Sequence, residues 1–326
     1  MIRSHVRRIN DEASSDTQRS RGVSRATQRP WRAGSSTSWD ALVRVLLTGA
    51  GGQLGLELAA VLPHGGHEVV DLDRQRLDVA DPDAVDDAME EHTPEIVVNA
   101  AAYTNVDGCE EATDLAYAAN ALGPRNLAQA CERRGSKLLH VSTNYVFDGE
   151  GERPYEPFDP PHPISAYGRT KLAGEDLVMR LTNRWFVVRS AGVYGRGHNF
   201  VRTMLRVAQE RDRLEVKDDE FISPTYARDL AQGIVGIIEE GRYGIYHLTN
   251  AGSCSWYEFT REIFRLAGVE TEVVAIPGSE YPLPAARPAN GVLSSVGSPK
   301  LRHWREALAD YLAQEGVASD SVRVGS

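Results

Sequence analysis

The stretch VRVLLTGAGGQLG, from Val43 to Gly55, decides the fold of this chain. An apolar run leads into a glycine-rich turn, and the segment Leu54–Leu62 after it has the apolar spacing of a helix. A strand, a glycine turn and a helix in this order predict a dinucleotide-binding unit, with a pyrophosphate at the amino end of the helix. The glycines follow the spacing Thr-Gly-x-x-Gly-x-x-Gly rather than Gly-x-Gly-x-x-Gly, and a single glycine turn is weak evidence.

A second strand strengthens this interpretation. Residues 68–72 are mostly apolar and end at Asp73, about 20 residues beyond the glycine turn, where an acid binds an adenosine ribose. Asp73 favours an unphosphorylated ribose, whereas Arg74 and Arg76 would neutralise a 2′-phosphate. The sequence therefore leaves both NADH and NADPH open as the cofactor.

Apolar runs and helical stretches alternate through the rest of the chain, which predicts an α/β fold: a Rossmann-type doubly wound parallel sheet with a smaller interleaved C-terminal substrate domain. Further strands are expected at 95–99, 137–141, 185–189 and 244–249. Further helices are expected at 82–91, 116–134, 200–211, 226–240, 255–267 and 304–312.

These elements suggest a domain organisation. Residues 43–189, with 226–250 returning to them, form the expected dinucleotide-binding domain, and residues 190–225 and 251–315 form the expected substrate-binding domain. Residues 1–42 carry eight arginines against four acids and have no hydrophobic period, so a disordered basic tail is expected there, with a second disordered tail at 316–326. A nucleic-acid arm or a transit peptide is an alternative for the first tail, but we favour an unstructured extension.

Candidate catalytic residues lie between Leu138 and Lys171. An apolar strand ends at Thr143, and a helix expected to open at about Ser165 would carry Tyr167 and Lys171 four residues apart on one face. A free tyrosine has a pKa of about 10, so a neighbouring ammonium would help it exchange a proton near neutral pH. The Thr143 hydroxyl would hold a substrate carbonyl. This spacing occurs by chance on many helices, so the cofactor motif gives it most of its weight.

Composition excludes several functions. The formal net charge of −10 argues against a nucleic-acid surface, and no apolar run approaches the roughly 18 residues of a membrane span. The three cysteines are odd in number and far apart, which indicates reduced thiols in a cytoplasmic protein. His64 and His67 are the only close histidine pair and have no cysteine or acid in register, so no metal site is expected.

Several ordered motifs carry a family resemblance. Between about Val43 and Leu312 the chain resembles the dTDP-4-dehydrorhamnose reductases, which are extended short-chain dehydrogenase/reductases. The motifs are the glycine turn, NAAAYTNVD (99–107), STNYVF (142–147), YGRTKLAGE (167–175), HNF (198–200), SPT (223–225) and RPAN (287–290).

The resemblance implies NAD(P)H-dependent reduction of the 4-keto group of a dTDP-4-keto-6-deoxyhexose, most simply dTDP-4-dehydro-L-rhamnose to dTDP-L-rhamnose or a related deoxysugar step. Tyr167 would protonate the alkoxide, Lys171 would lower the tyrosine pKa and bind the nicotinamide ribose, and Thr143 would orient the carbonyl. The implied cofactor-binding residues are Gly49, Gly52, Gln53, Leu54, Gly55, Asp73, Asp78, Val79, Ala102, Tyr103, Thr104, Tyr167 and Lys171. The implied substrate-binding residues are Thr104, Val106, Thr143, Asn144, Gly192, Asn199 and Arg287.

Two departures from the family pattern bear on the substrate. Asn144 stands where the family usually has aspartate, and Gly192 stands where it commonly has tryptophan, which we interpret as added room for a differently configured or more substituted sugar. The expected partner is a dTDP-linked 4-keto sugar, without nucleic acid or membrane, and a homodimer is left open. A catalytically silent sugar-nucleotide-binding or regulatory subunit of the same fold is the alternative, against which Thr143, Tyr167 and Lys171 are all present.

Overall fold

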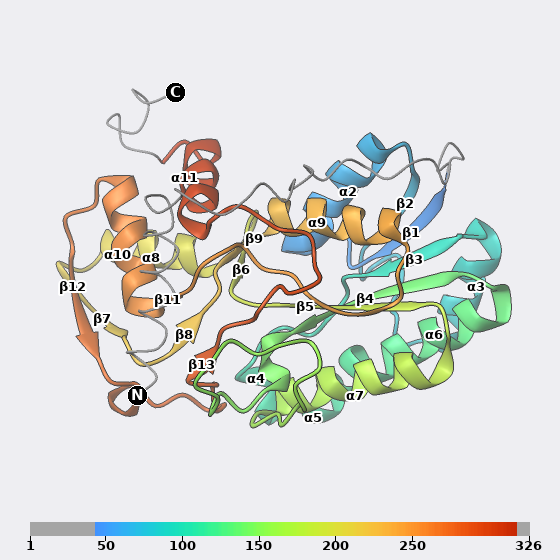
Figure 1. Cartoon of the computed structure of the whole chain (residues 1–326), viewed down its shortest axis with the longest axis horizontal. Coiled ribbons are helices and arrows are strands. Elements are labelled where there is room, and N and C mark those ends of the chain that lie inside the picture. Colours follow the sequence, from blue (N-terminus) through green and yellow to red (C-terminus); the bar gives the residue numbers. More distant parts are fainter. Residues whose placement is uncertain (1–42, 318–326) are drawn as a thin grey trace, which may run out of the picture.

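A computed structural model describes residues 43–317 of the chain (Figure 1). The predicted basic tail, 1–42, lies outside the described residues. So does the predicted C-terminal tail, 316–326, except for its first two residues.

The centre of the fold is a parallel sheet of six strands in the order β10-β5-β4-β3-β1-β2. The strands are β1 (Arg44–Thr48), β2 (Glu68–Leu72), β3 (Ile96–Asn99), β4 (Lys137–Thr143), β5 (Trp185–Ser190) and β10 (Gly244–His247). All six were predicted, with ends that differ by at most two residues. The doubly wound α/β fold is confirmed.

Helices cover both faces of this sheet (Figure 1). Successive side chains of a strand point to opposite faces, so Val45 and Leu47 of β1 join one buried cluster and Leu46 joins another. Helices α2 (Gln53–Val61) and α9 (Ala227–Glu240) pack on the first face. Helices α3 (Pro82–His92), α6 (Gly123–Arg134) and α7 (Ala166–Leu181) pack on the second. Apolar strands buried on both sides explain the nearly continuous apolar runs in the sequence.

The strand order reverses between β1 and β3. The chain leaves β1 for β2 on one side and then crosses over to β3 on the other side. In an open parallel sheet such a reversal leaves a crevice at the carboxyl ends of the strands, and ligands bind there. The glycine turn follows β1 and the segment Ala100–Tyr103 follows β3, so both border this crevice.

A smaller lobe lies beside the sheet (left in Figure 1). Helices α8 (Phe200–Ala208), α10 (Trp256–Ala267) and α11 (Trp304–Gln314) enclose its core, which contains Phe259 and Trp304. Strands β7 (Arg213–Lys217) and β12 (Glu272–Ile276) form a parallel pair that was not predicted. Alternating Leu214 and Val216, both buried, were the available signal for β7.

One predicted helix is interrupted. The expected helix at 116–134 consists of α5 (Thr113–Tyr117), a π-helical turn (Ala118–Leu122) and α6. Within the π turn Asn120 is buried and bonds both backbone groups of Tyr103 and the Thr170 hydroxyl. These partners are distant in sequence, so local spacing did not indicate the turn.

Three findings bear on the exclusions made from composition. No helix within residues 43–317 is long and apolar enough to cross a membrane. Cys109, Cys131 and Cys254 are free and buried. Over the same residues no group of three or more histidine, cysteine or acidic side chains is placed to hold a metal ion.

Candidate active site

The glycine turn forms a cradle that only glycine fits. A Cβ on Gly55 would lie 2.1 Å from the Gly49 carbonyl oxygen, and a Cβ on Gly49 would lie 2.5 Å from the Ala101 nitrogen. Gly49 also has a φ of +72°, which favours glycine. These contacts bring the turn against β3 and hold the start of α2 close to the crevice.

The start of helix α2 offers unpaired donors. Gly52 is its N-cap and supplies no side-chain hydrogen bond, so the first backbone N–H groups have no partner within the helix. The Gln53 side chain bonds the His198 carbonyl through Nε2 (2.9 Å), while its buried Oε1 has no partner among the described residues. Unpaired N–H groups at a helix start suit a pyrophosphate, so this cradle fits a dinucleotide.

A cavity of about 430 Å³ opens beside the cradle. Its volume lies within the range typical of small-molecule sites. Seven of the predicted cofactor residues line it: Gly49, Gly52, Asp73, Asp78, Val79, Ala102 and Tyr103. Arg74, Leu115 and Ala118 also line it, and Leu115 and Ala118 were not predicted. Gln53, Leu54, Gly55, Thr104, Tyr167 and Lys171 do not line this cavity.

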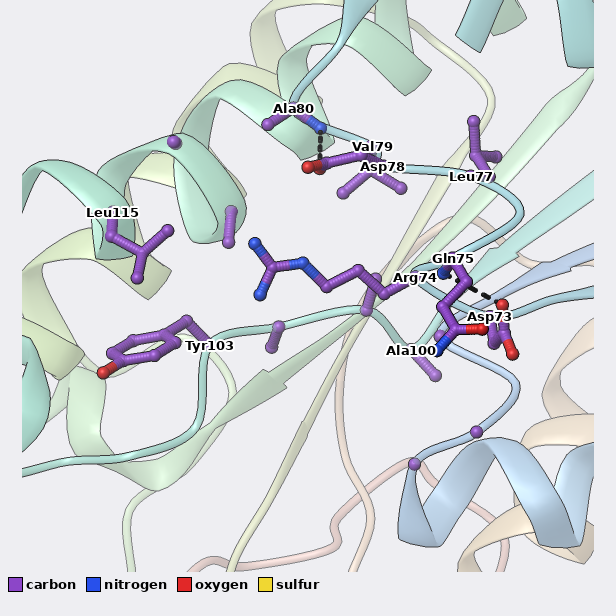
Figure 2. A pocket seen from close by; sticks show the side chains of 17 residues that line it. Asp73, Arg74, Gln75, Leu77, Asp78, Val79, Ala80, Ala100, Tyr103 and Leu115 are labelled. Carbon is purple, nitrogen blue, oxygen red and sulfur yellow. Dashed lines mark hydrogen bonds between the residues drawn. The ribbon is translucent and has the colours of Figure 1, made fainter. Parts of the chain in front are cut away.

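Arg74 and Arg76 differ in orientation. Figure 2 shows the Arg74 side chain extending across the cavity towards Leu115. Within residues 43–317 its guanidinium has no hydrogen-bond or ion-pair partner. Arg76 instead donates to the Asp71 carbonyl oxygen at 2.7 Å and does not line the cavity. Asp73 accepts the backbone N–H groups of Gln75 and Arg76, both at 3.0 Å, through one carboxylate oxygen.

The three candidate catalytic residues lie on β4 and α7, which pack against each other. Thr143 is the last residue of β4. Helix α7 opens at Ser165, as predicted; Ser165 is its N-cap, and its hydroxyl accepts the Gly168 N–H. Tyr167 and Lys171 follow in the first two turns, and Gly168 lets the helix approach closely because a Cβ there would lie 2.2 Å from the Tyr145 carbonyl oxygen.

The Tyr167 hydroxyl lies beside the Thr143 side chain. Burial raises its pKa above the ordinary value, and a hydrogen bond with the Thr143 side chain opposes that rise. The Tyr145 ring packs edge-on against the Tyr167 ring, with centroids 5.4 Å apart. Thr143 and Tyr167 therefore present two hydroxyl groups together at the carboxyl end of β4.

Lys171 is almost completely buried, and its Nζ donates to the Val141 carbonyl oxygen at 2.7 Å. Burial lowers its pKa to about 8, while the charge of Glu175 opposes this effect. The expected lowering of the Tyr167 pKa by Lys171 stays a prediction.

The predicted substrate residues have diverse positions. Thr104 is exposed and Val106 is half-buried in the loop after β3. This loop is tied to the C-terminal segment because Asp107 forms two 2.7 Å hydrogen bonds with Arg287. Hydrogen bonding to Arg287 is the largest cause that lowers the pKa of Asp107. Arg287 is therefore already paired.

Asn144, which follows β4, connects this strand to the C-terminal part of the chain. Its amide donates to the Gly291 carbonyl oxygen at 3.2 Å, in strand β13 (Asn290–Gly291), and its Oδ1 lies 3.3 Å from the Thr143 hydroxyl. An aspartate at this position would lose the first of these bonds because an ionised carboxylate cannot donate. The amide at this position thus has a structural role in this chain.

Two interpretations of individual residues need correction. Gly192 does not leave open space: its φ is +53°, and an added Cβ would lie 3.2 Å from Ile222 and 3.3 Å from Pro224. Asn199 caps helix α8: its Oδ1 accepts the Arg202 N–H, and its Nδ2 donates to the Gly195 carbonyl oxygen and the Tyr311 hydroxyl. Its side chain is therefore fully engaged by the protein.

A second cleft of about 730 Å³ adjoins Tyr145 and Arg287 and was not predicted. Its apolar lining includes Phe200, Met204, Val207, Trp256 and Leu283, and its basic lining includes Arg211, Arg213, Lys217 and Arg287. Lys217 and Arg213 are paired with glutamates, whereas Arg211 has no ion pair within the described residues. The sequence signal was an amphipathic α8 followed by basic residues, but the lining comes from segments far apart in the chain.

Comparisons with known proteins agree with this geometry. The family described as RmlD substrate binding domain matches residues 43–317. The dTDP-4-dehydrorhamnose reductase of Streptomyces griseus is 43% identical over 82% of this chain and 92% of its own length. The dTDP-4-keto-6-deoxy-D-glucose reductase of Streptomyces niveus is 40% identical over 81% of this chain and 95% of its own length.

A solved structure is also similar. It is the dTDP-4-dehydrorhamnose reductase of Bacillus anthracis in complex with NADP, with a TM-score of 0.81 and 38% identity. The match covers 84% of this chain and all of that one. The similarity therefore includes both the sheet and the smaller lobe.

Proposed function

The chain belongs to the dTDP-4-dehydrorhamnose reductase family of NAD(P)-dependent oxidoreductases, and we propose that it reduces the 4-keto group of a dTDP-4-keto-6-deoxyhexose. The observation that carries this proposal is the joint position of Thr143, Tyr167 and Lys171 on β4 and α7, at the carboxyl edge that also holds the glycine cradle. The silent-subunit alternative finds no support, because the relatives compared above are named reductases.

The protein supplies binding and proton transfer in this reaction. Gly49, Gly52 and the first turn of α2 would hold the pyrophosphate, and the bound nicotinamide supplies the hydride for C4. The Thr143 hydroxyl holds the carbonyl oxygen, and Tyr167 donates its proton to that oxygen as negative charge develops. Burial of these groups excludes water and strengthens their hydrogen bonds.

The second cleft is the proposed site of the dTDP group. Its rings and aliphatic side chains suit a thymine and a deoxyribose, and the unpaired Arg211 suits a diphosphate oxygen. Tyr145 contacts both this cleft and the Tyr167 ring, so a nucleotide bound there would extend its sugar towards the catalytic hydroxyls. Arg287 would contribute only if the ligand competed with Asp107. A homodimer, a cytoplasmic location and the absence of a nucleic-acid partner remain predictions from the sequence.

Arg74 is the proposed determinant of coenzyme preference. Its free guanidinium lies in the cavity where the adenosine ribose is expected, so it would bind a 2′-phosphate (Figure 2). Hydrogen bonds to charged groups contribute about 1.5–3 kcal/mol. We expect Arg74→Ala to raise the KM for NADPH about tenfold or more and to leave the KM for NADH nearly unchanged.

Arg76→Ala is the matched control, because Arg76 is held by the Asp71 carbonyl outside the cavity. Steady-state kinetics with both coenzymes would test the assignment. Equal losses with NADPH and NADH, or a larger effect from Arg76→Ala, would contradict it.

The sugar is proposed to be dTDP-4-dehydro-L-rhamnose. The case for a larger sugar rested partly on open space at Gly192, and the tight backbone there removes that argument. We expect a higher kcat/KM with dTDP-4-dehydro-L-rhamnose than with dTDP-4-keto-6-deoxy-D-glucose, measured by the loss of nicotinamide absorbance. The reverse order would restore the hypothesis of a different deoxysugar, and no turnover of either would reject the proposed function.

Asn144→Asp distinguishes a structural role of Asn144 from a role in the choice of sugar. Loss of the bond to Gly291 leaves a buried carbonyl facing a carboxylate, so we expect lower kcat/KM and a lower melting temperature than in the wild type. Improved turnover would instead mean that the amide marks a pocket adapted to another sugar.

A further inference from the structure

A chain of buried polar groups leads from the middle of the sheet to Lys171. Thr48 on β1, Asn99 on β3 and His140 on β4 have no exposed surface, and Lys171 is 2% exposed. Hydrogen bonds connect them in this order, and the proposed reaction uses only the last. A buried polar group without a hydrogen-bond partner costs free energy, so each group in this network is expected to be paired. Its donors and acceptors can therefore be assigned.

The orientation of the Asn99 amide is fixed by its neighbours. Its Oδ1 accepts the Ala101 backbone N–H at 3.1 Å and the Thr48 hydroxyl at 2.7 Å. A backbone N–H can only donate, so the oxygen must face Ala101, and the NH₂ group must face His140. Asn99 Nδ2 lies 3.0 Å from His140 Nδ1.

This orientation determines the tautomer of His140. Nδ1 faces a donor and must therefore be an unprotonated acceptor. Burial, followed by the charge of Lys171, lowers the pKa of His140 well below its ordinary value, so the ring is neutral. A neutral imidazole without a proton on Nδ1 carries it on Nε2.

The Nε2–H group faces Lys171. The two nitrogens are 3.4 Å apart, and Lys171 Nζ also donates to Val141. An ammonium has no lone pair, so its contact with Nε2–H sets two donors against each other. A neutral amine would accept the Nε2–H bond and keep its own bond to Val141.

We propose that His140 is a positioning residue that, held as the Nε2–H tautomer by Asn99, favours the neutral form of Lys171 and so promotes proton release from its ammonium group. The inference rests on the proposed function. As the O–H bond of Tyr167 breaks, its proton forms a new O–H bond with the oxygen on C4. The Tyr167 phenolate then takes a proton as an N–H bond of Lys171 breaks. His140 stabilises the amine that remains, and solvent returns the proton.

The other titratable groups around Lys171 and Tyr167 act differently. On α7 the Glu175 carboxylate raises its pKa, but Arg189 of β5 and the Ser142 hydroxyl of β4 bind that carboxylate. Tyr167, also on α7, and Cys109 of α4 (Gly108–Glu111) are neutral near pH 7, because burial raises both pKa values. His140 is thus the neighbour that opposes the charge of Lys171 directly.

The tautomer is measurable without any ligand. Selective ¹⁵N labelling of histidine, with His140→Phe to assign the signal among the nine histidines, reports which ring nitrogen carries the proton. We expect His140 to be the Nε2–H tautomer from neutral pH down to the acid limit of folding. An Nδ1–H tautomer, or a ring that protonates near pH 6.5, would overturn the proposal.

The pH profile tests the effect on Lys171. The reaction starts from the ammonium, so kcat should fall as pH rises through the Lys171 pKa of about 8. His140→Phe removes the opposing donor. In Asn99→Asp the carboxylate accepts a hydrogen bond and so favours the Nδ1–H tautomer of His140, which turns the Nε2 lone pair towards the ammonium. Each change favours the charged lysine, so in each variant the fall of kcat with rising pH should occur about one pH unit higher than in the wild type.

His64→Gln is the control, because His64 is exposed and bonds only the Ala60 carbonyl among the described residues. In this variant kcat should fall at the same pH as in the wild type. A downward shift or no shift in either folded variant would overturn the proposal. If wild-type turnover is absent, the proposed function fails while the labelled spectrum still decides the tautomer.

Discussion

A Tyr167→Phe variant is expected to have a kcat lower by a factor of about 10² to 10⁴, because this change removes a positioned general acid. Its affinity for the coenzyme should stay nearly that of the wild type. The adenosine cavity is lined by other residues, so coenzyme binding there should persist. The ring of phenylalanine keeps the edge-on contact with Tyr145, which limits the structural effect to the hydroxyl group. The measurement is single-turnover kinetics together with a coenzyme titration.

Tyr117→Phe is the matched control for this experiment. Tyr117 is 39% exposed on α5, so loss of its hydroxyl should leave kcat unchanged. A Tyr167→Phe variant that retained more than half of the wild-type kcat would exclude Tyr167 as the proton donor.

The second large effect concerns stability. Arg189→Met is expected to lower the free energy of unfolding by about 3–5 kcal/mol, because it leaves the Glu175 carboxylate buried without its ion-pair partner. Arg189 is 2% exposed and donates to Glu175 from Nε at 3.0 Å and from Nη2 at 2.6 Å. It also donates to the Pro157 carbonyl and lies over the Phe147 ring. The pair therefore joins β5, α7 and the loop before α7.

Urea unfolding would measure this loss. Arg206→Met is the control, because Arg206 forms an exposed pair with Glu210, which contributes about 0.3–0.5 kcal/mol. The double variant Arg189→Met, Glu175→Leu should recover much of the lost stability, since neither charge is then buried alone. A loss below about 1 kcal/mol in the single variant would mean that Glu175 is neutral or solvated in the folded protein.

Much of the fold could be predicted because its signals are local. The glycine turn, the apolar run before it and the N-cap at Ser165 each act within a few residues, and the structure contains the corresponding β1, α2 and α7. The π turn at Ala118–Leu122 depends on Tyr103 and Thr170, which no local pattern connects to it. Strands β7 and β12 are short and pair across more than fifty residues of sequence.

The site was predictable to the extent that its residues follow strand ends. Thr143 ends β4 and Asp73 directly follows β2 in the same parallel sheet, so their common edge follows from topology. The roles of Gly192 and Asn199 could not be predicted. The positive φ of Gly192 and the hydrogen bonds of the Asn199 side chain depend on the folded structure. The same applies to Asn99, whose motif gave no indication that it fixes the tautomer of His140.

The most direct test of the reductase assignment is the fate of a deuterium label. The enzyme would be incubated with dTDP-4-dehydro-L-rhamnose and with NADPH or NADH that carries deuterium at the transferred position, and the product would be analysed by NMR. Hydride transfer predicts one deuterium at C4 of the dTDP-6-deoxyhexose for each coenzyme oxidised. Coenzyme oxidation without deuterium at C4, or no oxidation in the presence of the keto sugar, would contradict the assignment.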